Sequence, residues 1–175
     1  AWMMFRSDLE QCGGFLAKSY PEDYDLCFRW YKQGLKVLGL NELVLLWRQH
    51  DLRTSNTWEA FQPRNFTRMK MHYFLELHHQ GNRPIFLWGV GDRGKDIAQF
   101  LHEQNITFHW VSAHPGKIEK SIQGQKIKGL GAFKLSQLKQ GQHLISFAES
   151  KGKQAVKNWS QNLGLNSMED FFFLA

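Results

Sequence analysis

Three carboxylates lie within four positions of one short segment, SYPEDYDLCFRW, at residues 19–30. They are Glu22, Asp23 and Asp25, and apolar and aromatic residues follow them directly. Carboxylates spaced in this way can serve an enzyme as a general base and an orienting group. The same residues also suit the first turn of a helix, because the positive end of the helix dipole favours negative charge. Position alone leaves both interpretations open.

A second segment with chemical potential is GVGDRG, at residues 89–94. It follows an apolar run and precedes a helical pattern, which is the context that a GxGxxG signature requires. The glycines permit a tight turn, and the N–H groups at the helix start can face an anion. We therefore predict a phosphate or nucleotide site, and its candidate residues are Gly89, Gly91, Arg93, Gly94 and Lys95.

The dinucleotide form of such a site makes a further demand. An Asp or Glu should end the next strand, where it would hold the ribose hydroxyls. That strand ends in WVSAHP, so Ser112, Ala113 and His114 occupy the place of the acid. The sequence thus disfavours NAD and NADP. It leaves open another phosphate-bearing ligand, or a strand-to-helix turn that binds nothing.

The elements that position the carboxylates are short. Ser7 or Asp8 is the expected cap of a first helical turn, and Pro21 and Gly34 are typical of the start and end of the next helix. The opening AWMMF predicts a buried strand, so we expect a fragment that opens inside a domain. In order, we expect a strand at residues 1–5, a helical turn within 6–14, a helix at 21–34, two strands within 36–50 and a helix after Pro63.

The segment GNRP, at residues 81–84, is the best linker candidate and divides the chain into domains at 1–80 and 81–175. The second part alternates strands with helices, which predicts an α/β fold with a small, doubly wound parallel sheet. We expect strands at 85–89, 106–113, 125–130, 143–148 and 170–175, and helices at 92–104, 132–140 and 150–164.

The composition of the 175 residues excludes several classes of protein. Apolar residues make up 42% and aromatic residues 14%, enough for a folded core. The net charge of +6 falls mostly after residue 80. No apolar run reaches the roughly 20 residues of a membrane span. Two separated cysteines, Cys12 and Cys27, predict reduced thiols in a cytoplasmic protein.

Histidines and tryptophans suggest further sites that the spacing does not support. His72, His78 and His79 could bind a metal, but no compact set of four ligands accompanies them. The seven tryptophans lie at apolar positions of expected strands and helices, which favours core packing over stacking on nucleic acid. We predict neither a metal site nor a nucleic-acid partner for this chain.

The order of three motifs in residues 1–60 resembles the C-terminal half of the GT-A domain of family 2 glycosyltransferases. These motifs are MMFRSDLEQCGGF, PEDYDLCFRW and GLKVLGLNELVLLWRQHDLRTS. The resemblance implies that the chain begins with a partial GT-A-like segment. It also implies inverting transfer of a sugar from a nucleotide-sugar to a sugar or other hydroxyl acceptor.

The resemblance also implies roles for individual residues. Asp23 would accept the proton of the acceptor hydroxyl, a contribution worth about 10²–10⁴-fold in rate, and Glu22 would orient the acceptor. The family's arginine–histidine element implies that Arg48, His50 and Arg53 contact the donor diphosphate. Asp25 and Arg29 would support the helix.

Such enzymes bind the nucleotide-sugar, with Mg²⁺ or Mn²⁺, on an N-terminal half that carries a DxD-type motif. No such motif precedes MMFRSD, and DYD at residues 23–25 belongs to the acidic motif. We therefore expect a divalent cation in the full-length enzyme, none in this chain, and no activity from this chain alone.

Residues 84–175 resemble a Rossmann-like domain appended to some family 2 glycosyltransferases. The resemblance lies in FLWGVGDRGKDIAQFL, HPGKIEKSIQGQKIKG and the terminal DFFFLA. It implies a fold that handles nucleotide-sugars. Two alternatives remain: a non-catalytic module that binds a nucleotide-sugar or a protein, and an NAD(P)-dependent oxidoreductase. The sequence does not indicate an oligomeric state.

Overall fold

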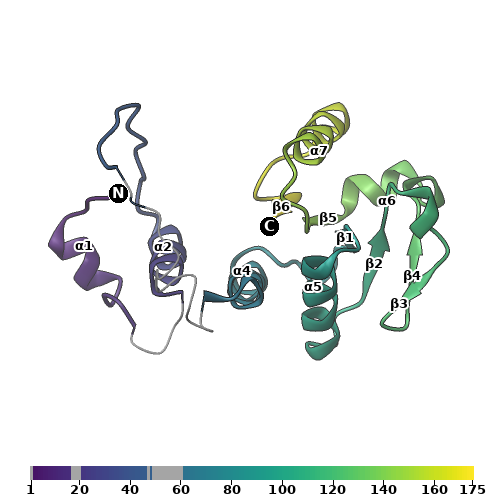
Figure 1. The fold of residues 1–175 in the computed structure, drawn as a ribbon, viewed down its shortest axis with the longest axis horizontal. Helices are drawn as coiled ribbons and strands as arrows, with labels where there is room; N and C mark the ends of the chain where they lie inside the picture. Colours follow the sequence, from purple (N-terminus) through teal and green to yellow (C-terminus); the bar gives the residue numbers. More distant parts are fainter. Residues whose placement is uncertain (1, 17–20, 47, 49–60) are drawn as a thin grey trace. The chain divides into compact units, whose positions relative to one another are not determined.

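The computed structural model describes residues 2–16, 21–46, 48 and 61–175. The chain forms two compact units, Ala1–Met69 and Lys70–Ala175, which we call the N-terminal and the C-terminal unit (Figure 1). The division falls inside helix α4 (Pro63–Leu77), whose second half supplies Met71 and Phe74 to the core of the C-terminal unit. The domain limits of 1–80 and 81–175 stay a prediction.

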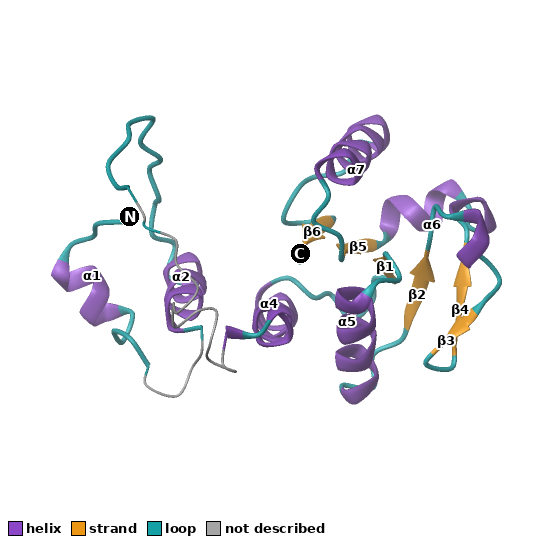
Figure 2. Ribbon diagram, viewed as in Figure 1, coloured by secondary structure: helices purple, strands orange, loops and turns teal. Residues whose placement is uncertain are grey.

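The C-terminal unit is an α/β fold built on a six-stranded sheet with the strand order β3-β4-β2-β1-β5-β6 (Figure 2). All neighbouring strands are parallel except β3 and β4, and this arrangement is consistent with a Rossmann-like fold. The strands are β1 (Ile85–Trp88), β2 (Phe108–Val111), β3 (Ser121–Ile122), β4 (Gln125–Lys128), β5 (Gln142–Ile145) and β6 (Phe171–Phe173). The helices are α5 (Asp92–Glu103), α6 (Leu135–Gln140) and α7 (Ser150–Leu163), with 3₁₀ turns η2 (Pro115–Lys117) and η3 (Leu130–Ala132).

Two hydrophobic clusters lie on opposite faces of this sheet. Successive strand residues point to opposite faces, so Ile85 and Leu87 join α4 and α5 in one cluster, while Phe86 and Trp88 join α6 and α7 in the other. Both faces are covered, which is why all four residues of β1 are buried and apolar.

The alternation of strands and helices predicted for this unit is confirmed, but the strands are shorter than predicted. Two details differ. The expected helix at 132–140 begins only at Leu135, because residues 130–132 form a 3₁₀ turn. The antiparallel strand β3 was not expected, because only Ser121 and Ile122 belong to it and two residues carry no readable pattern.

The N-terminal unit contains α1 (Arg6–Gln11), α2 (Glu22–Lys32) and the start of α4. Its core is small: Cys12, Leu26 and Trp30 are buried, with Met4, Leu9 and Leu35 packed against them. The predicted helices are confirmed here. The predicted cap is wrong, because α1 is preceded by Phe5, and Asp8 lies within its first turn.

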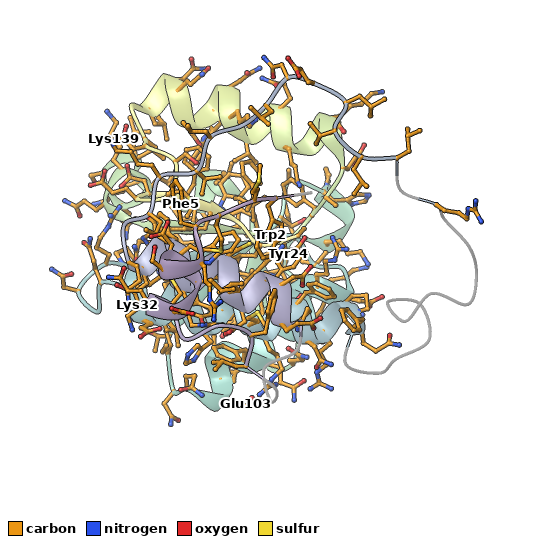
Figure 3. The ribbon with its side chains drawn as sticks, turned by 90° about the vertical axis from the view of Figure 1, so that its left-hand side faces the viewer. Trp2, Phe5, Tyr24, Lys32, Glu103 and Lys139 are labelled. Carbon is orange, nitrogen blue, oxygen red and sulfur yellow. The ribbon has the colours of Figure 1, made fainter. Side chains whose placement is uncertain are left out.

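The strands predicted at 1–5 and 36–50 are wrong for the described residues. Residues 2–5 and 35–46 form no strand, since no neighbouring strand is present among the described residues to pair with them. The side chains of these segments are mostly exposed, among them Trp2 and Phe5, which Figure 3 labels. Tyr24 of α2, also labelled there, is exposed too.

The sequence also predicts that no membrane span is present and that both cysteines are reduced. Among the described residues, no helix has both the length and the apolar character needed to cross a membrane. Cys12 is buried, Cys27 is exposed, and both are free thiols.

Candidate functional site

The acidic motif forms the first turn of α2. Its cap is Pro21, which has no side-chain acceptor, so the helix start depends on the charges of Glu22, Asp23 and Asp25. These carboxylates have different surroundings. Asp23 is exposed, and its Oδ1 accepts a hydrogen bond of 2.9 Å from the backbone N–H of Tyr24.

Asp25 is a structural residue. Its Oδ2 accepts a hydrogen bond of 2.8 Å from Arg29 Nε, and the two side chains are only 9% and 15% exposed. The other guanidinium nitrogens donate to the carbonyls of Cys12 and Gly14, the latter at 2.7 Å. Arg29 therefore fastens the turn at Gly13–Gly14 to the acidic helix, and the two motifs that the sequence placed in order lie in contact.

Glu22 differs from both aspartates. Its Oε2 is buried and finds no hydrogen-bond partner among the described residues. A buried carboxylate oxygen without a partner is costly and calls for an explanation, such as a ligand hydroxyl that donates to it. Glu22 and Asp23 thus supply one unsatisfied and one exposed carboxylate at the same helix start.

Of the three cations expected on the donor diphosphate, one is among the described residues. Arg48 is exposed, and His50 and Arg53 lie outside the described residues. The expectation that these three residues contact a diphosphate stays a prediction.

The glycines of the β1–α5 turn have three different geometries. Gly89 has φ of +96°, a left-handed conformation that favours glycine, and a Cβ there would meet Ser146 Oγ at 2.5 Å. A Cβ on Gly94 would overlap the carbonyl of Gly89, so this glycine lets α5 pack tightly on β1. A Cβ on Gly91 would meet nothing within 4 Å. Of the three, Gly91 alone faces open space.

Two side chains fix the shape of this turn. Trp110 Nε1 donates to the Gly89 carbonyl at 2.7 Å, and Ser146 Oγ donates to the Trp88 carbonyl at 2.6 Å. Gly91 is the N-cap of α5 and makes no side-chain cap, so the amides at the helix start are not capped by a side chain from that position. The turn can therefore present a helix N-terminus to an anion.

The two predicted cations of this turn, Lys95 and Arg93, differ in their ion pairing. Lys95 is paired with Asp92 at 3.0 Å, on the exposed side of the helix. Arg93 is partly buried and makes no ion pair with a described residue. Arg93 is the better placed of the two predicted cations to meet a ligand.

The end of β2 carries no carboxylate. Ser112 Oγ accepts from the His114 backbone N–H at 3.1 Å, and His114 Nδ1 accepts from the Gly116 N–H at 3.1 Å. These bonds form a local turn that leads into η2. This turn therefore offers no carboxylate in place of the Asp or Glu that a dinucleotide site needs after its second strand.

His143 is a buried titratable residue that sequence reasoning missed. It lies in β5, fully buried, where its Nδ1 accepts from Trp88 Nε1 at 3.0 Å and its Nε2 lies 2.8 Å from the Leu138 carbonyl. Burial lowers its pKa to about 4. The only signal in the sequence was a histidine at the start of an apolar strand.

No group of three or more potential metal ligands occurs among the described residues. His78 and His79 follow α4, and burial lowers the pKa of His78. Comparisons with family models, with curated proteins and with solved structures found no match to this chain.

Proposed function

We propose that residues 1–80 are the acceptor side of a family 2 type glycosyltransferase domain, which transfers a sugar from a nucleotide-sugar to an acceptor hydroxyl with inversion. The observation that carries the proposal is the difference between the three carboxylates. Asp25 is occupied by Arg29, Asp23 is exposed, and an oxygen of Glu22 is buried without a described partner. Two carboxylates are thus left for an acceptor at the start of α2.

In the proposed reaction, Asp23 takes the proton of the acceptor hydroxyl while that oxygen attacks the anomeric carbon. The new carbon–oxygen bond forms as the bond to the nucleoside diphosphate breaks, and its electron pair leaves with the diphosphate. Glu22 would hold a hydroxyl of the acceptor through its unsatisfied oxygen.

The nucleotide-sugar donor would be contacted by residues other than the carboxylates at the start of α2. Arg48, His50 and Arg53 would balance charge on the departing diphosphate. A divalent cation would supply further charge stabilisation, and no residue of this chain is assigned to hold it.

The test is Asp23→Asn in the full-length protein. We expect transfer to fall by about 10²–10⁴-fold, because the general base is lost, while donor binding persists. Asp8→Asn, in the first turn of α1, is the matched control and should retain activity. Wild-type turnover by the Asp23 variant would remove this residue from its role, and transfer by the isolated chain would refute the need for a donor half.

A second candidate function concerns the C-terminal unit. We propose that it binds a nucleotide-sugar or a related phosphate-bearing nucleotide at the β1–α5 turn. The supporting observation is the open space at Gly91 beside a helix start without a side-chain cap.

A thermal-shift panel of UDP-, GDP- and dTDP-sugars, NAD and NADP tests this second function. Gly91→Val should abolish the shift while the free protein keeps its stability, since a Cβ at this position has nothing within 4 Å. Gly81→Val, also with nothing within 4 Å, is the control and should keep the shift. Stabilisation by NAD or NADP alone would favour the oxidoreductase instead.

A further inference from the structure

Lys70 brings a positive charge to the carboxyl edge of the sheet. It lies in α4, one turn before the core residue Phe74, and its Nζ donates to the carbonyl of Leu174 at 3.3 Å. Leu174 directly follows β6. The ammonium group is therefore fixed where the last strand ends.

Lys153 approaches the same edge from the opposite face. It belongs to α7, and its Nζ lies 5.6 Å from the ring centroid of Phe173. Phe173 packs with the α7 cluster, whereas Leu174 packs with the α4–α5 cluster. The last residue of β6, Phe173, and the residue after it, Leu174, thus contact two lysines at one edge from the two sides of the sheet.

Arg93 adds a third cation at this edge. It lies in the first turn of α5, which follows β1. Burial lowers the pKa of Lys70, and the positive charges of Arg93 and Lys153 lower it further, so each of these two cations is close enough to repel Lys70. No described carboxylate pairs with Arg93 or Lys153, in contrast to Lys95 and its partner Asp92.

The position of these cations in the sheet is informative. In the strand order, β1 lies between β2 and β5, so the chain's path reverses direction at the β1–β5 boundary. Open parallel sheets bind ligands outside the carboxyl ends of their strands at this point. Repulsion of Lys70 by Arg93 and by Lys153 raises the free energy of the protein without ligand, and an anion bound beside these cations would lower it.

We propose that Lys70, Arg93 and Lys153 together bind a diphosphate group at the carboxyl edge of β1, β5 and β6. This inference rests on the proposed phosphate binding at the β1–α5 turn and names the ligand class for that site. A diphosphate carries enough negative charge to balance three cations, which a monoanion does not. Since β2 ends without a carboxylate for ribose hydroxyls, the diphosphate supplies most of the recognition.

The test is calorimetric titration of the whole chain with inorganic pyrophosphate, at low salt and at physiological salt. Arg93→Gln and Lys153→Gln should each weaken binding about tenfold, because each removes a charge-assisted hydrogen-bond donor. Lys157→Gln, an exposed lysine of the same helix α7, is the matched control and should bind as the wild type does. Unchanged affinity in both Arg93→Gln and Lys153→Gln would overturn the proposal.

Melting temperatures without pyrophosphate exclude misfolding as the cause of weaker binding. Lys153→Gln should melt at or above the wild-type temperature, because it relieves repulsion between Lys153 and Lys70. Lowered stability of this variant without ligand would contradict the proposed repulsion.

The failure of this inference can be told apart from failure of the proposed nucleotide binding. Loss of UDP-sugar binding in Gly91→Val, with normal pyrophosphate binding in Arg93→Gln and Lys153→Gln, would support the β1–α5 site and refute the cation site. If the wild-type chain binds neither pyrophosphate nor any of the nucleotide-sugars, both the cation site and the β1–α5 site are refuted.

Discussion

The two units of this chain use similar apolar runs in opposite ways. In the C-terminal unit, the run Ile85–Trp88 is fully buried as the central strand of a sheet. In the N-terminal unit, a run of comparable character stays 48–86% exposed and forms no strand. The exposed residues of that run are Val37, Leu38, Leu40, Leu43, Val44, Leu45 and Leu46.

The difference lies in the neighbours and not in the residues. β1 is flanked by β2 and β5 and covered by helices on both faces, so its backbone and side chains are satisfied. Residues 35–46 have no such partners among the described residues. An apolar pattern is necessary for a strand, but a second strand and a covering layer are necessary too.

The exposed run also bears on the transferase proposal. Contiguous exposed apolar surface marks an interaction site in soluble proteins. Under that proposal, residues 35–46 are where strands of the donor-binding part of the domain would pair, and the isolated chain leaves this surface uncovered.

The largest expected effect is in the C-terminal unit. Gly94→Val should destabilise it by about 3 kcal/mol or more, because the new side chain would overlap the Gly89 carbonyl where α5 packs on β1. Urea unfolding followed by tryptophan fluorescence would measure the loss. The N-terminal unit should be unaffected in hydrogen exchange. A Gly94→Val variant as stable as the wild type would show that this unit is not tightly packed.

The next effect concerns pH and His143. Its pKa is lowered to about 4 in the folded protein and is about 6.5 in the unfolded chain. The unfolded state therefore binds a proton first as pH falls, and stability is lost between about pH 6.5 and pH 4. The loss should reach about 3 kcal/mol, and stability should be level above pH 7 with respect to this group.

Urea unfolding at several pH values tests this expectation. His143→Gln should flatten the dependence, although its stability at neutral pH will be lower, whereas the exposed His114→Gln should retain the wild-type slope. Equal slopes in the wild type and His143→Gln would contradict the buried, neutral state of this histidine.

The smallest effect is expected in the N-terminal unit. Arg29→Gln should release the Gly13–Gly14 turn from α2 and cost about 1–2 kcal/mol, since the Asp25 carboxylate loses its cation in a partly buried setting. Limited proteolysis should cut near Gly13 faster, with no change in the C-terminal unit. Arg6→Gln is the control, because the Arg6–Glu10 pair is exposed and contributes little. Wild-type cleavage of the Arg29 variant would show that the turn holds without this side chain.

Much of the C-terminal unit could be predicted from its sequence, because local pattern and global packing agree there. Alternating strands and helices follow from runs such as Ile85–Trp88, and the Gly89–Gly94 turn could be placed by its glycines. The short strand β3 has no readable sequence pattern. The two strands expected within residues 36–50 are absent from the described part of that range, because periodicity does not reveal whether a partner strand exists.

The candidate sites were predictable only in their local parts. Glu22 and Asp23 could be found from their spacing, and the i,i+4 spacing of Asp25 and Arg29 was a usable signal for their ion pair. The contacts of Arg29 with residues 12 and 14, and the convergence of Lys70 and Lys153, join segments far apart in the chain. No short-range pattern encodes such contacts, since they depend on the tertiary packing within each unit.

Trp110 has a practical consequence for studying this protein. Its buried indole donates to the Gly89 carbonyl, at the turn where a phosphate ligand is proposed to bind. The emission of an indole depends on its hydrogen bonding and on the local field. Trp110 is therefore an intrinsic fluorescent probe at the β1–α5 turn. The difference between the emission spectra of the wild type and Trp110→Phe would isolate the emission of Trp110 from that of the other tryptophans.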